Sequence, residues 1–257
     1  MTTLSTSDVG DGPVVVLVHG VGIGACAFAD LAASLAADHR VLVPHRRGYR
    51  PDDGEAVVVP GSATVAEQVD DLLGLLEVRG IDEATFVGVS GGATLVLALA
   101  MAAPAVVRSA VLHEAVFGPL APDLHVALQA AAARLKASGN GPEGVREFMV
   151  GLVGEERMAA LPAAAVTAIL HRRDVIRAEV PEFIAFAPAA EDLARLADVA
   201  LVATVGAQSP DFRQVAARVL VERTAARLEV LDGVRHLPQL DAPEAFEKVV
   251  RTASGER

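Results

Sequence analysis

One serine lies where it can act as a nucleophile. The Gly-Val-Ser-Gly-Gly segment at 88–92 directly follows an apolar, strand-like run and opens a helical pattern. Strand–turn–helix placement of this kind lifts the Ser90 hydroxyl off the edge of a sheet, and the glycines allow close backbone approach. The helix N-terminus and the N–H of Gly91 favour a negative oxygen nearby. Ser90 is therefore expected to attack a carbonyl carbon; the alternative is a glycine turn with a bystander serine.

A second chemical signal is the His-Gly-Val-Gly segment at 19–22, which ends an earlier strand-like run. A backbone N–H just past that strand can join the N–H of Gly91 in binding an oxyanion. We expect Val21 to supply this N–H, with Gly22 as the alternative donor. His19 is expected to brace the loop rather than to transfer protons.

The third signal is His236, which follows the last strand-like run of the chain and is the only histidine after position 171. Where a nucleophile, an acid and a base occur in that order along a chain, the base lies well beyond the serine. We therefore expect His236 to take the proton of Ser90 as a general base.

These residues must be held by a sheet with buried faces. Short runs, apolar throughout, alternate with longer helical patterns, which predicts an α/β fold with a mainly parallel sheet. The predicted strands are 13–18, 40–44, 84–89, 110–113, 200–205 and 227–231. The predicted helices between them are 28–37, 62–78, 92–103, 214–222 and 243–252.

One long stretch interrupts this alternation. Residues 117–190 contain no strand-like run, and about 70 helical residues are too many for a simple crossover between strands. The helical patterns there are 122–138, 142–154 and 155–177. We therefore expect a helical cap at 117–190, inserted into a core formed by 1–116 and 191–257.

Taken together, the 88–92 turn, the 19–22 loop and His236 resemble the α/β-hydrolase superfamily over nearly the whole chain. The His-Arg-Arg-Gly-Tyr segment at 45–49 also looks like the R-G-[YF] segment of that family. The resemblance implies a twisted, mainly parallel sheet of about eight strands, flanked by helices, with an inserted helical cap. The residues themselves indicate six parallel strands and at most one or two weaker ones before Pro13.

Where the acid lies is less clear than where the nucleophile and the base lie. The family usually places it a few residues after the strand that ends near Gly206, but the expected position is Ser209, and Asp211 is offset by two residues. Some members carry the acid at the end of the preceding strand, where this chain has Glu114. A buried carboxylate is costly without a partner, and a charged imidazole is a suitable one. We expect Glu114 to pair with His236, with Asp211 as the alternative.

Composition limits the partners. The chain has 257 residues, 52% of them hydrophobic, which excludes a disordered protein, and its net charge of −11 disfavours nucleic acid and anionic membranes. The single Cys26 is expected to be a buried apolar residue. Asp70 and Asp71 are expected on an exposed helix face, and the basic residues at 171–173 on a solvated one. No signal peptide or apolar run of membrane-spanning length is recognised, so we expect a cytoplasmic protein whose partner is a small-molecule substrate; a homodimer is left open.

These expectations predict a serine hydrolase that needs no cofactor and no metal. An enclosing cap favours a small, mostly apolar carboxylic ester or lactone, cleaved through an acyl-enzyme on Ser90. Four phenylalanines are expected between cap and sheet, where they could line the substrate pocket: Phe117, Phe148, Phe183 and Phe186. Two alternatives remain: a non-hydrolytic enzyme on the same scaffold (a lyase, a perhydrolase or a cofactor-free oxygenase) and a small-molecule receptor.

Overall fold

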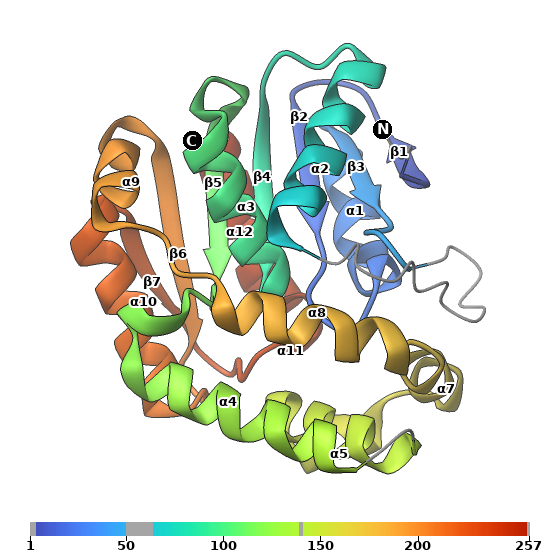
Figure 1. Cartoon of the computed structure of the whole chain (residues 1–257). Coiled ribbons are helices and arrows are strands. Elements are labelled where there is room, and N and C mark those ends of the chain that lie inside the picture. Colours follow the sequence, from blue (N-terminus) through green and yellow to red (C-terminus); the bar gives the residue numbers. More distant parts are fainter. Residues whose placement is uncertain (1–3, 50–63, 139–140, 256–257) are drawn as a thin grey trace.

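A seven-stranded sheet forms the centre of the molecule (Figure 1). The computed structural model describes residues 4–49, 64–138 and 141–255. In chain order the strands are β1 (Thr6–Val9), β2 (Val14–Val18), β3 (Arg40–Pro44), β4 (Ala84–Val89), β5 (Val107–His113), β6 (Ala200–Gly206) and β7 (Arg227–Leu231). Their order in the sheet is β1-β3-β2-β4-β5-β6-β7, and only β1 runs antiparallel to its neighbour. The mainly parallel sheet predicted from the sequence is confirmed, and the one weak strand before Pro13 is β1.

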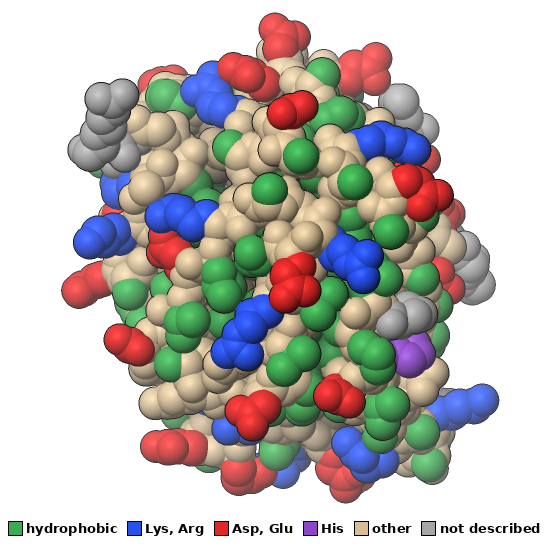
Figure 2. Space-filling view, turned by 90° about the vertical axis from the view of Figure 1, so that its left-hand side faces the viewer, with side chains coloured by type: hydrophobic (Ala, Val, Ile, Leu, Met, Phe, Trp, Pro, Cys, Tyr) green, Lys and Arg blue, Asp and Glu red, His purple; other side chains and the backbone are tan. Residues whose placement is uncertain are grey.

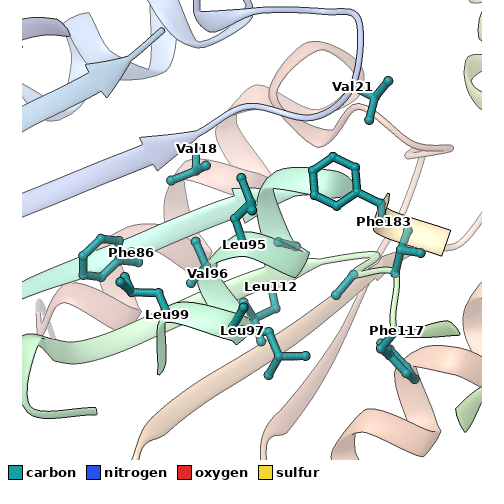
Figure 3. Packing of buried hydrophobic residues seen from close by; sticks show 14 of the residues in the cluster. Val18, Val21, Phe86, Leu95, Val96, Leu97, Leu99, Leu112, Phe117 and Phe183 are labelled. Carbon is teal, nitrogen blue, oxygen red and sulfur yellow. The ribbon is translucent and has the colours of Figure 1, made fainter. Parts of the chain in front are cut away.

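Helices cover both faces of this sheet, because successive side chains of a buried strand point to opposite sides. In β2, Val16 and Val18 belong to the apolar cluster that contains residues of α2, α3 and α10, whereas Val15 and Leu17 pack in the cluster of α1 and α12. The bounds of the covering helices are α1 (Ala29–Leu35), α2 (Val65–Arg79), α3 (Gly91–Ala102), α10 (Asp211–Thr224), α11 (Pro238–Asp241) and α12 (Pro243–Ser254). Figure 3 shows the packing where α3 crosses β4 and β5: Leu95, Val96 and Leu99 lie beside Phe86 and Leu112.

The chain between β5 and β6 is helical; residues 122–185 lie across the carboxyl ends of the strands, whereas residues 190–194 lie near the start of β6 (Figure 1). Its helices are α4 (Pro122–Ala137), α5 (Pro142–Val153), α6 (Glu155–Ala160), α7 (Ala163–His171), α8 (Arg173–Ala185) and α9 (Ala190–Ala194). The single helical pattern expected over 155–177 is wrong, because this stretch is divided between three helices. Leu161 is extended before Pro162, a residue that disfavours helical backbone in the one preceding it, and Arg172 turns the chain between α7 and α8. Four short 3₁₀ helices connect other elements: Ala25–Phe28, Pro104–Val106, Gly118–Leu120 and Arg195–Asp198.

Three expectations about single residues are also wrong. Cys26 is exposed, because the short 3₁₀ helix that carries it buries Ala25 and Phe28 instead. Asp71 is buried rather than exposed, and its carboxylate pairs with the guanidinium of Arg47 at 2.8 Å. The third, Arg172, is buried against the 19–22 loop rather than solvated.

Charges are mixed on one face of the molecule (Figure 2). On the face shown in Figure 2, Lys and Arg side chains alternate with Asp and Glu rather than gathering into a basic stripe. None of the helices that the structure describes combines the length and the apolar character needed to cross a bilayer.

Candidate functional site

Ser90 lies at the turn between β4 and α3 in a backbone conformation that is rare for a side-chain-bearing residue, with φ 56° and ψ −122°. The turn is tight because its glycines approach neighbouring backbone. A Cβ atom on Gly92 would lie 2.1 Å from the carbonyl oxygen of Val18, and one on Gly88 would lie 2.5 Å from the Cα of Ala93. No other residue type fits these two positions without a shift of the backbone, so the glycines of the 88–92 segment allow the conformation that presents Ser90.

The 19–22 loop lies directly against this turn. A Cβ on Gly20 would lie 3.1 Å from the Cβ of Ser90, and one on Gly91 would meet the side chain of Val21 at 3.2 Å. The N–H of Gly22 donates to the hydroxyl of Tyr49 at 2.9 Å, whereas no hydrogen bond within the described residues uses the N–H of Val21. Of the two expected donors, Val21 therefore has the N–H that is not already engaged.

The base and the acid predicted from the sequence are in contact. Nδ1 of His236 lies 2.5 Å from Oε2 of Glu114, although the two residues are 122 positions apart, and both side chains are buried. Glu114 follows β5 with a positive φ of 50°, which turns its side chain toward the loop after β7. A carboxylate can only accept hydrogen bonds, so Nδ1 carries the proton and Nε2 has the free lone pair that a general base needs.

Four further groups surround the Glu114 carboxylate. Oε1 accepts hydrogen bonds from the N–H of Gly206 at 3.2 Å and from the hydroxyl of Ser209, while Oε2 lies 3.3 Å from Nη1 of Arg213. Nε2 of His113 lies 3.6 Å from Oε1. Burial acts to raise the pKa of Glu114, but the charge of Arg213 and the interactions with His236 and His113 together outweigh it and hold that pKa well below the usual range. The carboxylate is therefore ionised at neutral pH.

Asp211, the alternative acid, is the first residue of α10 and is exposed. It makes no hydrogen bond or ion pair with His236. The position where the family usually carries its acid is occupied by Ser209, and the hydroxyl there donates to Glu114. Of the two carboxylates proposed from the sequence, the fold thus brings only Glu114 to His236.

His236 is neutral in this setting. Burial lowers its pKa below the usual value, and the nearby charge of Arg213 lowers it further, while Glu114 acts in the opposite direction. The hydrogen bonds of the described residues include none between the hydroxyl of Ser90 and His236. Such bonds are often long before substrate binds and tighten in the reacting complex.

Comparison with known proteins identifies the family of the chain. The sequence model of the Alpha/beta hydrolase family matches residues 15–249. The chain belongs to the α/β-hydrolase family.

Solved α/β-hydrolase structures superpose over almost the entire chain. A thermophilic esterase from Thermogutta terrifontis is 24% identical with a TM-score of 0.78, covering 97% of this chain and 92% of that one. The enol-lactonase from Burkholderia xenovorans LB400 is 19% identical with a TM-score of 0.79, covering 97% and 95%. These identities show a shared fold and leave the substrate open.

A curated relative matches only in part. A segment of 94 residues, 37% of this α/β-hydrolase, is 33% identical to the magnesium-chelatase 30 kDa subunit of Rhodobacter capsulatus. The segment spans 32% of the length of that subunit.

A cavity of about 30 Å³ adjoins Ser90 and has room for about two water molecules. Phe148 of α5 and Phe183 of α8 line it, and Figure 3 shows Phe183 beside Val21 at the start of α3. Two other expected lining residues lie elsewhere. Phe117 lines a smaller cavity behind Glu114, and Phe186 lines a groove between α2, α3 and the end of α8. The sequence predicted these phenylalanines between cap and sheet, but it could not decide which cavity each one faces.

A buried polar network, which the sequence analysis missed, connects α8 of this α/β-hydrolase to its 19–22 loop. Nη1 of Arg46 donates to Glu179 of α8 at 2.8 Å and to Gln68 of α2 at 2.6 Å. The hydroxyl of Tyr49 donates to Glu179 and accepts from the N–H of Gly22. Burial and the negative charge of Glu179 both raise the pKa of Tyr49, so this hydroxyl stays protonated as a donor.

One signal in the sequence could have revealed the network. Glu179 is spaced at three and four residues from Ile176 and Phe183, so it lies within the apolar stripe of a helical pattern. A carboxylate in such a stripe needs a buried partner. That partner, Arg46, belongs to the 45–49 segment that resembles the family.

The cluster of His113, Glu114 and His236 offers three potential metal-ligand atoms within 4.8 Å of one another. The residues do not fit a divalent cation well, because a guanidinium cation, that of Arg213, already lies 3.3 Å from the carboxylate. Burial lowers the pKa of His113 to about 4, so this imidazole is neutral beside the pair.

Proposed function

We propose that this α/β-hydrolase is a serine hydrolase that cleaves a small, mostly apolar carboxylic ester or lactone through an acyl-enzyme on Ser90. The observation that carries the proposal is the buried 2.5 Å contact of His236 with Glu114 at the edge of the sheet where the Ser90 turn also lies. Nucleophile, base and acid are then Ser90, His236 and Glu114.

In the first half of the reaction, Nε2 of His236 takes the proton from Ser90 as the oxygen attacks the carbonyl carbon. Glu114 holds the ring in the tautomer that leaves Nε2 free, and it stabilises the imidazolium that forms. The N–H groups of Val21 and Gly91 bind the developing oxyanion, and one such donor contributes about 3–4 kcal/mol to catalysis.

The first half ends when His236 gives its proton to the leaving alkoxide and the acyl-enzyme forms; in the second half, the neutral His236 activates a water molecule. Water attacks the acyl carbon, and Ser90 regains its proton as the acid is released. For a lactone, the leaving alkoxide stays attached to the acyl group, so that a single hydroxy acid is released.

The apolar character of the substrate is inferred from the cavity beside Ser90, which is lined mainly by apolar residues of the cap. Esterase and lactonase activities are named for two proteins of the same fold, from Thermogutta terrifontis and Burkholderia xenovorans LB400, which is compatible with either bond type. We further propose that the substrate is a small molecule, that neither nucleic acid nor membrane is a partner, and that the protein acts in the cytoplasm.

An active-site probe tests the nucleophile directly. The purified protein is treated with a fluorophosphonate, and the labelled residue is located by mass spectrometry, with Ser90→Ala as the matched control. Labelling of Ser90 that the alanine variant loses supports an activated serine, and hydrolysis of a panel of short acyl esters and lactones then tests the reaction. A folded protein that neither reacts with the probe nor hydrolyses any member of the panel would contradict the proposal and favour the non-hydrolytic or receptor alternatives.

A further inference from the structure

Arg213 is a buried cation whose hydrogen-bonding capacity is almost unused. Its side chain is only 4% exposed, and a guanidinium has five N–H donors. None of the hydrogen bonds in the part of the chain that the structure describes has this guanidinium as the donor, and Nη1 is buried without a partner. Its ion pair with Oε2 of Glu114, at 3.3 Å, does not have hydrogen-bond geometry. Buried polar groups nearly always have a hydrogen-bond partner, so we expect this guanidinium to bind a further group.

The same residue faces the reaction site. Arg213 lines the cavity that Ser90 and Gly91 also line, and among the described residues of that lining it is the only charged one. Apart from Ser90, the rest of the wall is apolar, with side chains from α4, α5 and α8 of the cap among them. A single cation in such a wall is an anchor for an anionic group, because competing water is scarce there.

The electrostatics of the site point in the same direction. The charge of Arg213 lowers the pKa of His236, which weakens the base that must accept the proton of Ser90. It also disfavours the imidazolium that forms during the reaction. A negative group bound to the guanidinium would offset both effects, so that binding an anion would make His236 a better base.

Resting on the proposed hydrolase function, we propose that Arg213 binds a carboxylate carried by the substrate, so that the preferred substrates are small esters or lactones bearing a second, free carboxylate. The carboxylate stays chemically unchanged and positions the neighbouring carbonyl carbon at Ser90. A guanidinium suits this role because it can bind a carboxylate through two parallel N–H···O bonds.

Two substrates of matched shape test the specificity. Monoethyl glutarate carries the carboxylate, and in ethyl 5-oxohexanoate a neutral methyl ketone replaces it; acid release is followed at constant pH. We expect the wild-type protein to favour the carboxylate by at least tenfold in kcat/KM. In Arg213→Gln this ratio should fall to about one or lower. Arg218→Gln, on an exposed part of the same helix, is the control and should retain the wild-type ratio.

Two results would overturn the proposal. One is a ratio near one between the kcat/KM values of the wild-type protein for the two substrates, a result that can be measured without any variant. The other is an equal loss for both substrates in Arg213→Gln, because a residue that only compensates the charge of Glu114 would impair all substrates alike. Arg213→Lys keeps the positive charge near Glu114, so it provides the same comparison if the glutamine variant does not fold.

A binding measurement separates this proposal from the hydrolase function. Glutarate is titrated into Ser90→Ala by calorimetry, and we expect binding that weakens at least tenfold when Arg213→Gln is added. If glutarate binds through Arg213 but no ester or lactone is cleaved, the hydrolase proposal fails and the carboxylate site stands. If neutral esters are cleaved and glutarate binding does not depend on Arg213, the hydrolase proposal stands and the carboxylate site is refuted.

Discussion

Glu114→Gln is the substitution that most directly tests the catalytic geometry. Glutamine has nearly the same size as glutamate, so its side chain can still contact Nδ1 of His236, which lies 2.5 Å from Oε2 of Glu114 in the wild type. Its amide nitrogen can donate to Nδ1, however, which would move the ring proton to Nε2 and leave no lone pair to accept the proton of Ser90. Loss of the tautomer and of the imidazolium partner in such a triad lowers kcat by about 10,000-fold, or about 5 kcal/mol.

Asp211→Asn is the matched control because it removes the same charge from the competing carboxylate. Asp211 is exposed and does not contact His236, so kcat is expected to change by less than about twofold. Steady-state hydrolysis of one ester by both variants gives the comparison. A Glu114→Gln enzyme within about tenfold of the wild type, or a loss of about 1,000-fold or more in Asp211→Asn, would refute the assignment of the acid.

The Glu114→Gln variant must also be shown to be folded. Arg213 loses its ion-pair partner in this variant, and breaking a buried pair by removing one member lowers the free energy of unfolding by about 3–5 kcal/mol. Urea denaturation followed by circular dichroism measures this loss. Activity is then compared at a temperature where each variant remains native, so that a fall in kcat reflects the chemistry.

Three further predictions concern the surroundings of the site. Adding Ser209→Asp to the Glu114→Gln variant supplies a carboxylate from position 209, whose hydroxyl donates to Glu114 in the wild type. We expect kcat to recover at least tenfold relative to Glu114→Gln alone. No recovery would mean that a carboxylate at position 209 cannot reach the imidazole of His236. Phe148→Ala enlarges the cavity beside Ser90. The larger cavity should raise the ratio of kcat/KM for an octanoyl ester to that for an acetyl ester by at least tenfold. An unchanged ratio would mean that the acyl chain does not bind in this cavity. Tyr49→Phe leaves the N–H of Gly22 without its acceptor and removes one of the donors to the buried carboxylate of Glu179. Urea denaturation should show a loss of about 1–3 kcal/mol in the free energy of unfolding, and a loss below about 0.5 kcal/mol would contradict this.

The pH dependence follows from the low pKa of His236. The imidazole must be neutral to act as a base, so the acidic limb of kcat/KM should lie below the ordinary histidine value of about 6.5. Removing the charge of Arg213 raises the pKa of His236, so Arg213→Gln should shift this limb to higher pH. An acidic limb above 6.5 in the wild type, or one that Arg213→Gln moves to lower pH, would contradict the electrostatic argument.

The parts of the fold that the sequence predicted correctly depend on local interactions. A short apolar run bounded by turn residues, such as 84–89, favours a strand with two covered faces, and the glycines around Ser90 allow a close backbone approach that a Cβ atom would prevent. Both conclusions follow from the sterics of a few neighbouring residues. The division of 155–177 into three helices was missed because the apolar spacing continues through it, although Pro162 marked one of the breaks.

The partners of the buried charges depend on the tertiary structure alone. Glu114 and Asp211 were both plausible acids in the sequence, and only the register of β5 against β6 brings Glu114 to the loop that carries His236. Arg213 gave no sequence signal at all, because a lone arginine near the start of a helix is usually solvated. Its burial beside Ser90 results from the packing of α10 against β6.

The sequence by itself therefore determined the fold class, the turn that presents Ser90 and the choice of His236 as the candidate base. The tertiary structure decided that Glu114 rather than Asp211 meets that base, and that the hydroxyl of Ser209 donates to Glu114. It also decided that Arg46 pairs with Glu179 of α8, which lies 133 positions away in the chain. The physical reason is that backbone sterics and apolar periodicity act between near neighbours in the chain. Charge pairing acts through space, and a sequence does not state which distant residues share a buried volume.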